Sequence, residues 1–242
     1  MFALWSVTMY VILLFIAVTS VNYAEACSCL QAHPQTQFCD ADFVMQVRLH
    51  GKAEEIFKKE RHTMFDKETN TSETIINRRK VAIKYNVKIK QIFKINENNL
   101  GLDKSSTVTE IYTAPDDGLC GVHLQERTNY LLSGKYRKDA LEIDLCSSMF
   151  TPWPWVSKMQ KKGLRFTYAK NCDCEIINPH FSRASKDANQ CVFDPYKPIG
   201  KCHERNSACI HDKNSSTTGC KWMRNSKMRK CRQELKSGRL EP

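Results

Sequence analysis

The sequence lacks the residue patterns that mark common catalytic sites. It has no H-E-x-x-H motif and no glycine-rich phosphate loop, and its seven histidines are scattered along the chain. No Ser-His-Asp order falls within a recognisable motif. These absences argue against an enzyme, and we expect no catalytic residues.

The first 26 residues lack cysteine, lysine and arginine, and Glu25 is their only charged residue. An uncharged run, 2–24, leads into Ala24-Glu25-Ala26, which is the small-x-small pattern of a signal-peptidase site. We therefore expect 1–26 to be a signal peptide cut before Cys27, which leaves a secreted protein without a membrane span. The missing basic start leaves an uncleaved anchor helix open, because the run approaches the ~20 residues that a span needs.

Acidic residues are too few to balance the basic ones. The chain of 242 residues has 26 acidic and 37 basic side chains, a formal net charge of +11, and loss of Glu25 with the signal peptide raises it to +12. A secreted protein this basic should bind acidic surfaces such as sulfated matrix polysaccharides. Nucleic acid is the other common partner of a basic protein, but the secretory signal argues against it.

All twelve cysteines lie beyond the predicted cut. An even number in a secreted chain predicts a disulfide framework, although sequence alone does not give the pairing. Two metal or redox interpretations compete with it. Cys172-Asp173-Cys174 could be a redox or zinc pair, though its spacing fits neither C-x-x-C template, and a zinc knuckle could combine Cys202, His203, Cys209 and His211.

Alternating apolar residues predict two clear strands, at 42–49 and 81–89. Further short strands are expected near 107–113, 129–134 and 140–145. Five short strands separated by turn residues favour a small closed barrel of the OB type.

The segments between and after these strands are less regular. Residues 52–79 are charged and show no sustained period, so we expect a long exposed loop there, with a glycosylation sequon at Asn70. A helix could start at 153–161, with Pro154 near its first turn and Trp153 and Trp155 packed at the barrel end.

The last part of the chain has little apolar periodicity and should depend on cross-links. We expect a separate disulfide-held subdomain at 173–242, with a second possible sequon at Asn214. Residues 221–240 carry eight Lys or Arg against Glu234. They are either a solvated, frayed tail or a surface for matrix or membrane adhesion.

Two blocks of sequence carry a family resemblance. One is Cys27-Ser28-Cys29 followed by His33-Pro34-Gln35-Thr36-Gln37-Phe38-Cys39; the other comprises Ile111–Pro115, Leu119–Val122 and Tyr130–Lys135. Over most of 27–174 the chain resembles the tissue inhibitors of metalloproteinases. The resemblance implies a mainly β protein with flanking helices: a five-stranded OB-type closed barrel (netrin-like) at 27–172, then a small disulfide-held carboxyl-terminal subdomain.

The resemblance also implies a disulfide pairing. In the barrel it joins Cys27 to Cys120, Cys29 to Cys146, and Cys39 to Cys172. The carboxyl-terminal part departs from the family, because the close cysteine pair usually found soon after Cys174 is missing and Cys202 and Cys231 stand outside the pattern. There we expect Cys174–Cys220, Cys191–Cys209 and an extra bridge, Cys202–Cys231.

By this resemblance the protein is a secreted inhibitor of zinc metalloproteinases, with no cofactor of its own. After cleavage, the α-amine of Cys27, with a pKa of about 7.7–8.0, is partly neutral at physiological pH. That nitrogen and the carbonyl oxygen of Cys27 can close a five-membered ring on the zinc of the target enzyme. Cys27 would thus be the metal-binding residue through main-chain atoms alone.

The resemblance assigns the neighbouring residues to the protease cleft. Ser28 would enter the pocket for the substrate residue that follows the scissile bond, and His33 would shape the turn after this segment. The Asp116-Asp117 pair departs from the family and could narrow the range of proteases. The expected protease contacts are Cys27, Ser28, Cys29 and Leu30, the loop residues Asp117, Gly118 and Leu119, and Asp40 at the rim.

Two rival functions remain open at this stage. A secreted netrin-like module could use the same barrel to bind matrix or signalling proteins without inhibiting a protease, and such a module needs no free terminal cysteine. A disulfide oxidoreductase would need a reactive thiol. Amino-terminal sequencing separates the first rival from the inhibitor, since only the inhibitor must start at Cys27.

Overall fold

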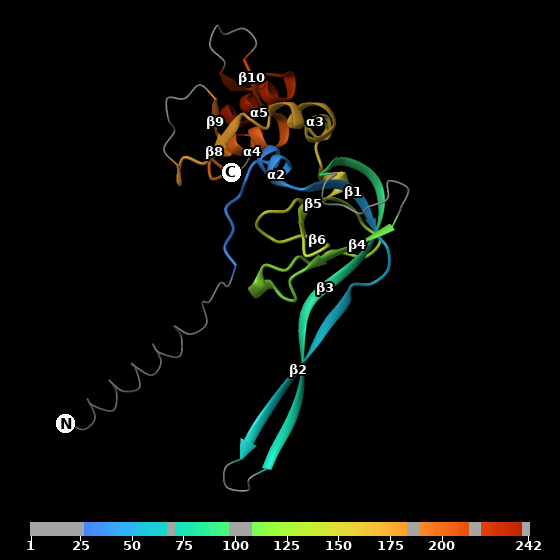
Figure 1. The fold of residues 1–242 in the computed structure, drawn as a ribbon. Coiled ribbons are helices and arrows are strands. Elements are labelled where there is room, and N and C mark those ends of the chain that lie inside the picture. The colour runs from blue at the N-terminus through green and yellow to red at the C-terminus, as the bar shows by residue number, and fades with distance from the viewer. Residues whose placement is uncertain (1–26, 67–70, 97–107, 183–188, 213–218, 239–242) are drawn as a thin grey trace, which may run out of the picture.

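The computed structural model describes residues 27–66, 71–96, 108–182, 189–212 and 219–238. The predicted signal peptide, Asn70 of the first predicted sequon and the whole second sequon at Asn214 fall outside these ranges. Within them, no helix combines the length and the apolar character that crossing a bilayer requires. Figure 1 shows a barrel with a long hairpin on one side and a helix-rich subdomain on the other.

Five strands close the barrel: β1 (Phe43–Leu49), β3 (Thr71–Ile95), β4 (Val108–Thr113), β5 (Asn129–Arg137) and β6 (Ala140–Glu142). β1 pairs antiparallel with β3 on one side and with β5 on the other. β3 also pairs antiparallel with β4, β4 pairs parallel with β6, and β6 pairs antiparallel with β5. The ring has no open edge, so the predicted five-stranded barrel is confirmed.

The barrel core follows from the alternation seen in the sequence. Phe43, Met45 and Val47 of β1 point inward and are fully buried, and each contributes about 1.5–3 kcal/mol by leaving water. Val44, on the opposite face of β1, packs in a second cluster under the flanking helices. Gly134 of β5 is needed where strands crowd, because a Cβ there would lie 2.1 Å from the Glu142 carbonyl oxygen.

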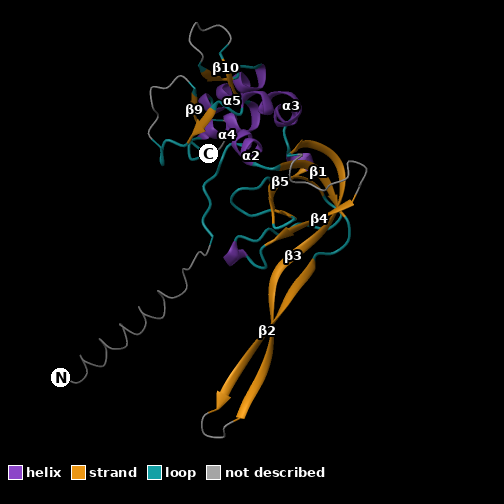
Figure 2. Cartoon of the chain, in the orientation of Figure 1, coloured by secondary structure: helices purple, strands orange, loops and turns teal. Residues whose placement is uncertain are grey.

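The charged segment predicted as a loop is a regular β-hairpin, so that prediction was wrong. β2 (Glu54–Asp66) pairs with the first half of β3 through Asp66↔Thr71. Figure 2 shows this pair as an extended ribbon that runs away from the barrel. Most of its described side chains are exposed on both faces, so no apolar period marked it in the sequence.

Short helices and one short strand cover the end of the barrel. α2 (Pro34–Asp40) precedes β1, and β7 (Phe150–Pro152) adds to β5 before a 3-10 turn (Trp153–Trp155) and α3 (Lys158–Lys162). Helix α3 thus starts later than predicted, because Ser157 caps it and forms a capping box with Gln160. A π turn (Gly163–Thr167) and a 3-10 turn (Tyr168–Asn171) follow.

The two tryptophans beside Pro154 behave differently. Trp153 stacks on Phe93 with ring centroids 6.0 Å apart, which fits the predicted packing at the barrel end. Trp155 is 70% exposed, so the prediction was wrong for that residue.

In its described residues, the carboxyl-terminal subdomain has two small sheets and two helices. β8 (Glu175–Ile177) pairs parallel with β9 (Gln190–Val192), and β10 (Cys209–His211) pairs antiparallel with β11 (Cys220–Trp222). The helices are α4 (Pro198–Asn206) and α5 (Ser226–Lys236).

The basic end of the chain is not a frayed tail in its described part. Asn225 caps α5 by accepting from the Met228 amide at 2.9 Å, and Met228 is buried. Cys231 bonds α5 to Cys202 of α4. Repulsion between the many Lys and Arg side chains of α5 disfavours this helix, and the disulfide helps to hold it in place.

Six disulfides join all twelve cysteines, and the described chain has no free cysteine. The pairs are the same six that the sequence analysis expects: Cys27–Cys120, Cys29–Cys146, Cys39–Cys172, Cys174–Cys220, Cys191–Cys209 and Cys202–Cys231. The metal-thiolate and free-thiol alternatives were therefore wrong for the oxidised protein, since every sulfur is bonded to another.

Candidate functional site

The described chain starts with a short segment, 27–33, that Figure 1 shows as an extended blue trace beside the barrel. Cys27 and Cys29 are half-buried, whereas Ser28 is exposed and Leu30 is 48% exposed. Alternate side chains of an extended chain point to opposite sides. The two cysteines thus hold the segment to the protein while Ser28 and Leu30 face outward.

The two disulfides of this segment pack against each other. Cys27 is bonded to Cys120 and Cys29 to Cys146. The Cys27 Sγ atom lies 3.6 Å from the Cys146 Sγ atom, and the Cys120 Sγ atom lies 3.9 Å from it. Four sulfurs form one cluster under the segment, and none of them is a thiolate that could bind a metal.

The loop that receives Cys27 is held in one conformation. Asp116 caps a 3-10 turn by accepting from the Leu119 amide at 3.0 Å. Cys120 has a φ of 61°, and Gly121 packs so closely that a Cβ would lie 2.6 Å from a backbone oxygen. The turn leaves 117–119 exposed, with Leu119 64% exposed.

The loop that receives Cys29 is held by a carboxylate. Asp144 accepts from the Cys146 amide at 2.9 Å and from the Ser147 amide at 2.7 Å. The two loops are joined because the Leu145 amide donates to the Cys120 carbonyl at 3.0 Å. We call the two loops that carry Cys120 and Cys146, with their disulfides to Cys27 and Cys29, the double clamp. A hydrogen bond joins the two loops, so the double clamp is one connected unit.

The structure brings most of the expected contact residues together. Residues 27–30 and the exposed turn 117–119 are joined through Cys120 and form one continuous edge. Asp40 lies at the end of α2 and lines a hollow of about 200 Å³ together with Cys146. The Asp117 carboxylate pairs with His123 at 2.8 Å on the exposed side of the turn.

Sequence reasoning missed a groove that residues of the segment line. Its volume is about 590 Å³, and its lining includes Leu30, Trp155, Leu164 and Glu204. The Trp-Pro-Trp sequence was the signal, but it was interpreted as packing. Trp155, with its exposed indole, and Leu30 line the same groove, which extends the surface that a partner of this edge could contact.

His33 begins α2 as its N-cap, in agreement with the expected role in the turn. Its Nδ1 accepts from the Gln35 amide at 3.1 Å, so the neutral ring donates from Nε2 to the His203 carbonyl at 3.2 Å. Burial lowers the pKa of His33 to about 4, which keeps the ring neutral at physiological pH.

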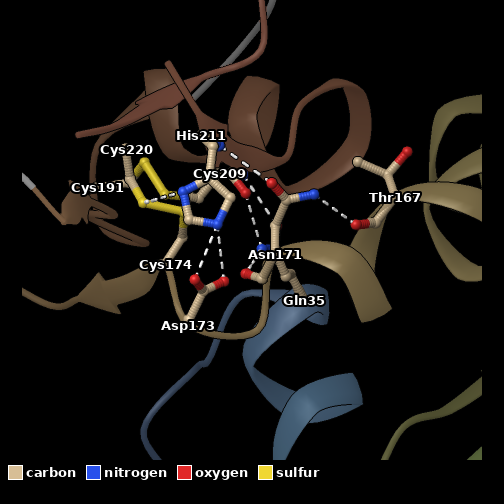
Figure 3. Close-up of a disulfide and its surroundings, with 9 residues drawn as sticks. All are labelled: Gln35, Thr167, Asn171, Asp173, Cys174, Cys191, Cys209, His211 and Cys220. Atoms are coloured by element: carbon tan, nitrogen blue, oxygen red, sulfur yellow. Dashed lines mark hydrogen bonds and ion pairs between the residues drawn. A yellow bond between two sulfur atoms is a disulfide. The ribbon is translucent and has the colours of Figure 1, made fainter. Parts of the chain in front are cut away.

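Gln35 fastens the same helix to the carboxyl-terminal subdomain. Its amide nitrogen donates to the carbonyls of Asn171 and Cys209, both at 2.9 Å, and its oxygen accepts from the Cys209 amide at 2.9 Å. Figure 3 shows Gln35 reaching from α2 to these groups. Both amide hydrogens of Gln35 are donated and its oxygen accepts one bond, so the segment before α2 starts from a fixed base.

Comparison with known proteins agrees with this arrangement. Residues 25–222 match the family described as tissue inhibitor of metalloproteinase. Metalloproteinase inhibitor 2 of Rattus norvegicus is 30% identical over 218 residues, 87% of this chain and 87% of that protein. The human protein of that name is 29% identical with the same coverage, and the tissue inhibitor of metalloproteinase of Drosophila melanogaster is 28% identical over 86% of this chain and 87% of its own.

Proposed function

The chain belongs to the tissue inhibitor of metalloproteinase family, a family of inhibitors rather than enzymes, and its relatives are named for metalloproteinase inhibition. From that premise we propose that it is secreted and caps the catalytic zinc of a metalloproteinase with its own amino terminus. The proposal requires removal of residues 1–26, which exposes the α-amine of Cys27.

The zinc would be bound by main-chain atoms. The sulfur of Cys27 is bonded to Cys120, so the donors that remain on this residue are its amine nitrogen and carbonyl oxygen. A catalytic zinc keeps one position for water or substrate, and this nitrogen and oxygen would take it. The displaced water is the one that attacks a peptide bond, so hydrolysis would stop.

The observation that carries the proposal is the double clamp around an exposed serine. Cys27 and Cys29 are each held by a disulfide, and Ser28 between them faces solvent. A segment fixed in this way loses little conformational entropy when it binds. Residues 117–119 and Asp40 would contact the cleft on either side of it.

The basic hairpin supports a second partner, a sulfated matrix polysaccharide. Lys59 lies opposite Arg78, and Lys58 lies opposite Arg79, so like charges face each other across the ribbon. Of these four cations, only Arg79 has a carboxylate within ion-pair distance in the described chain, Glu60 at 3.4 Å. Paired cations on an extended arm favour a linear polyanion.

The direct test is an extension of the amino terminus by one alanine. The protein that starts at Cys27 should inhibit a purified zinc metalloproteinase, and the protein with alanine before Cys27 should lose at least about a hundredfold in affinity, because an amide nitrogen does not donate to zinc. An extension of the same length at the carboxyl terminus is the matched control. Full inhibition by the alanine-extended protein would contradict the proposal.

A further inference from the structure

A histidine lies against one of the six disulfides. The Nδ1 atom of His211 is 3.8 Å from Cys174 Sγ and 3.9 Å from Cys220 Sγ, and these two sulfurs are bonded to each other. The Nε2 atom of the same ring is 2.8 Å from the Asp173 carboxylate. Figure 3 shows the ring between the carboxylate and the disulfide.

The contacts fix which ring nitrogen faces the sulfurs. An ionised carboxylate only accepts, so Nε2 of His211 carries a hydrogen and donates it to Asp173. The strand is held as well, because the His211 amide donates to Asn171 Oδ1 at 3.0 Å. Nδ1 is therefore directed at the disulfide, where it can accept a proton and return it, as in an acid–base histidine.

One sulfur of this disulfide is more accessible than the other. Cys174 is buried at 4% exposure, whereas Cys220 is half-buried and the His211 side chain is 42% exposed. Among the disulfides, all of which lie in the described chain, this is the one with a histidine nitrogen in contact with its sulfurs. A small reagent from solvent would reach Cys220 first.

We propose that Cys174–Cys220 is a reaction site for low-molecular-weight thiols such as glutathione, with His211 carrying the proton. The thiol gives its proton to His211 Nδ1, and its sulfur bonds to Cys220 Sγ. The bond between the two cysteine sulfurs breaks, the electron pair goes to Cys174 Sγ, and His211 returns the proton there. One thiol is consumed, and the products are a mixed disulfide at Cys220 and a thiol at Cys174.

The reaction would change the carboxyl-terminal subdomain and leave the inhibitory edge intact. Cys220 lies in β11, and opening its bridge releases that strand from the residue before β8. Cys27–Cys120 and Cys29–Cys146 are separate bonds on the barrel. The site does not depend on the proposed inhibition, and its failure would leave that proposal untouched.

The test is a map of the first thiol adduct. The purified protein, starting at Cys27, is incubated with reduced glutathione at neutral pH, acid-quenched, alkylated and analysed by peptide mass spectrometry. The first adduct should be on Cys220, with Cys174 alkylated. His211→Ala should slow adduct formation at least about tenfold, and imidazole in the buffer should restore much of the rate, as expected of proton transfer.

His180→Ala is the matched control, because His180 also pairs with a carboxylate, Asp194 at 3.1 Å, but has no sulfur contact. Its adduct rate should equal that of the unmodified sequence. His211→Gln, which keeps a polar side chain, gives a second slow variant that imidazole does not rescue. A first adduct on another disulfide, or a slow His211→Ala protein that imidazole leaves slow, would overturn the proposal.

Discussion

His33 and Gln35 occupy positions that a polar residue rarely holds, since each is only 1% exposed. Both lie where the segment 27–33 joins α2, and both bond to backbone groups of the carboxyl-terminal subdomain. The histidine ring also packs on Trp222, with centroids 5.1 Å apart. These two side chains therefore fix where the segment that carries Cys27 begins.

His33 predicts a pH-dependent stability. Burial lowers the pKa of His33 and of the neighbouring His203 to about 4. Between about pH 6.5 and pH 4 the unfolded chain binds protons that the folded protein excludes, so the free energy of unfolding falls as the pH falls. For His33 the loss is about 3 kcal/mol. Urea unfolding at about pH 7 and pH 4.5 measures it.

His33→Asn is the control for that measurement, because asparagine keeps an N-cap acceptor but does not titrate. Its free energy of unfolding should fall less over the same interval. An equal fall in both proteins would assign the pH dependence to other groups.

Ser28 predicts selectivity among proteases. Ser28→Gly removes an exposed side chain without moving either clamping cysteine. Because pockets differ between enzymes, inhibition constants across a panel should weaken unequally, by up to about tenfold. Ser237→Gly, at the end of α5, should change none of them. A uniform effect of Ser28→Gly would mean that the side chain enters no pocket.

Some strands and helices could be predicted from the sequence and others could not. Residues 81–89 of β3 alternate because one face is core and the other solvent, and that prediction was confirmed. In β2 and the outer part of β3, most of the described side chains are exposed on both faces. The sequence therefore shows no apolar alternation there, and the hairpin was missed. Helix α5 was missed for another reason: the expected bridge Cys202–Cys231 does not by itself give the conformation of the residues around Cys231.

The candidate site shows the same division. The resemblance implied a segment held at Cys27 and Cys29, and in the structure both cysteines are bonded and Ser28 between them is exposed. The base under it could not be predicted, since Gln35 is polar and its partners lie 136 and 174 residues away. Trp155 was assigned to packing because tryptophan usually is packed, and only the fold shows its exposure.

If the double clamp prepares the segment for binding, removing one of its disulfides should reduce both stability and inhibition, whereas removing a distant disulfide should reduce stability alone. Removing Cys29–Cys146 by alanine at both positions should weaken inhibition at least about tenfold, because the freed residues must be ordered on binding at about 1–2 kcal/mol each. Removing Cys202–Cys231 in the same way is the matched control. Both variants should lose about 2–5 kcal/mol of stability, yet only the first should lose affinity.

Inhibition assays and urea unfolding on the two double variants decide this point. Equal inhibition by both proteins would mean that the clamp stabilises the fold without preparing the segment.

Two features extend over the whole molecule: its positive net charge, and the hydrogen bonds that connect the barrel side to the carboxyl-terminal subdomain. The formal charge of +11 is spread over the chain, and the hairpin carries part of it away from the barrel. The contacts of His33 and Gln35 cross the boundary that the sequence places at residue 172. That boundary stays a prediction, and the subdomain is positioned to support the segment before α2.

The charge predicts salt-sensitive binding to immobilised heparin, used as a sulfated polysaccharide. The protein should be retained at about 0.05 M salt and released before about 1 M, because salt screens exposed charges. The double variant Lys59→Glu, Arg78→Glu should elute at clearly lower salt. A control with Lys170→Glu and Lys201→Glu has the same net charge and should elute later than the hairpin variant. Identical elution would exclude the hairpin as the binding surface.

The central claim, that Cys27 caps a catalytic zinc with main-chain atoms, is measured most directly in a crystal structure of the complex between the protein starting at Cys27 and a metalloproteinase catalytic domain. The account predicts the Cys27 nitrogen and carbonyl oxygen at about 2.0–2.2 Å from the zinc, with Ser28 in the adjacent pocket. A zinc that keeps its water, with Cys27 in solvent and another part of the chain in the cleft, would contradict it.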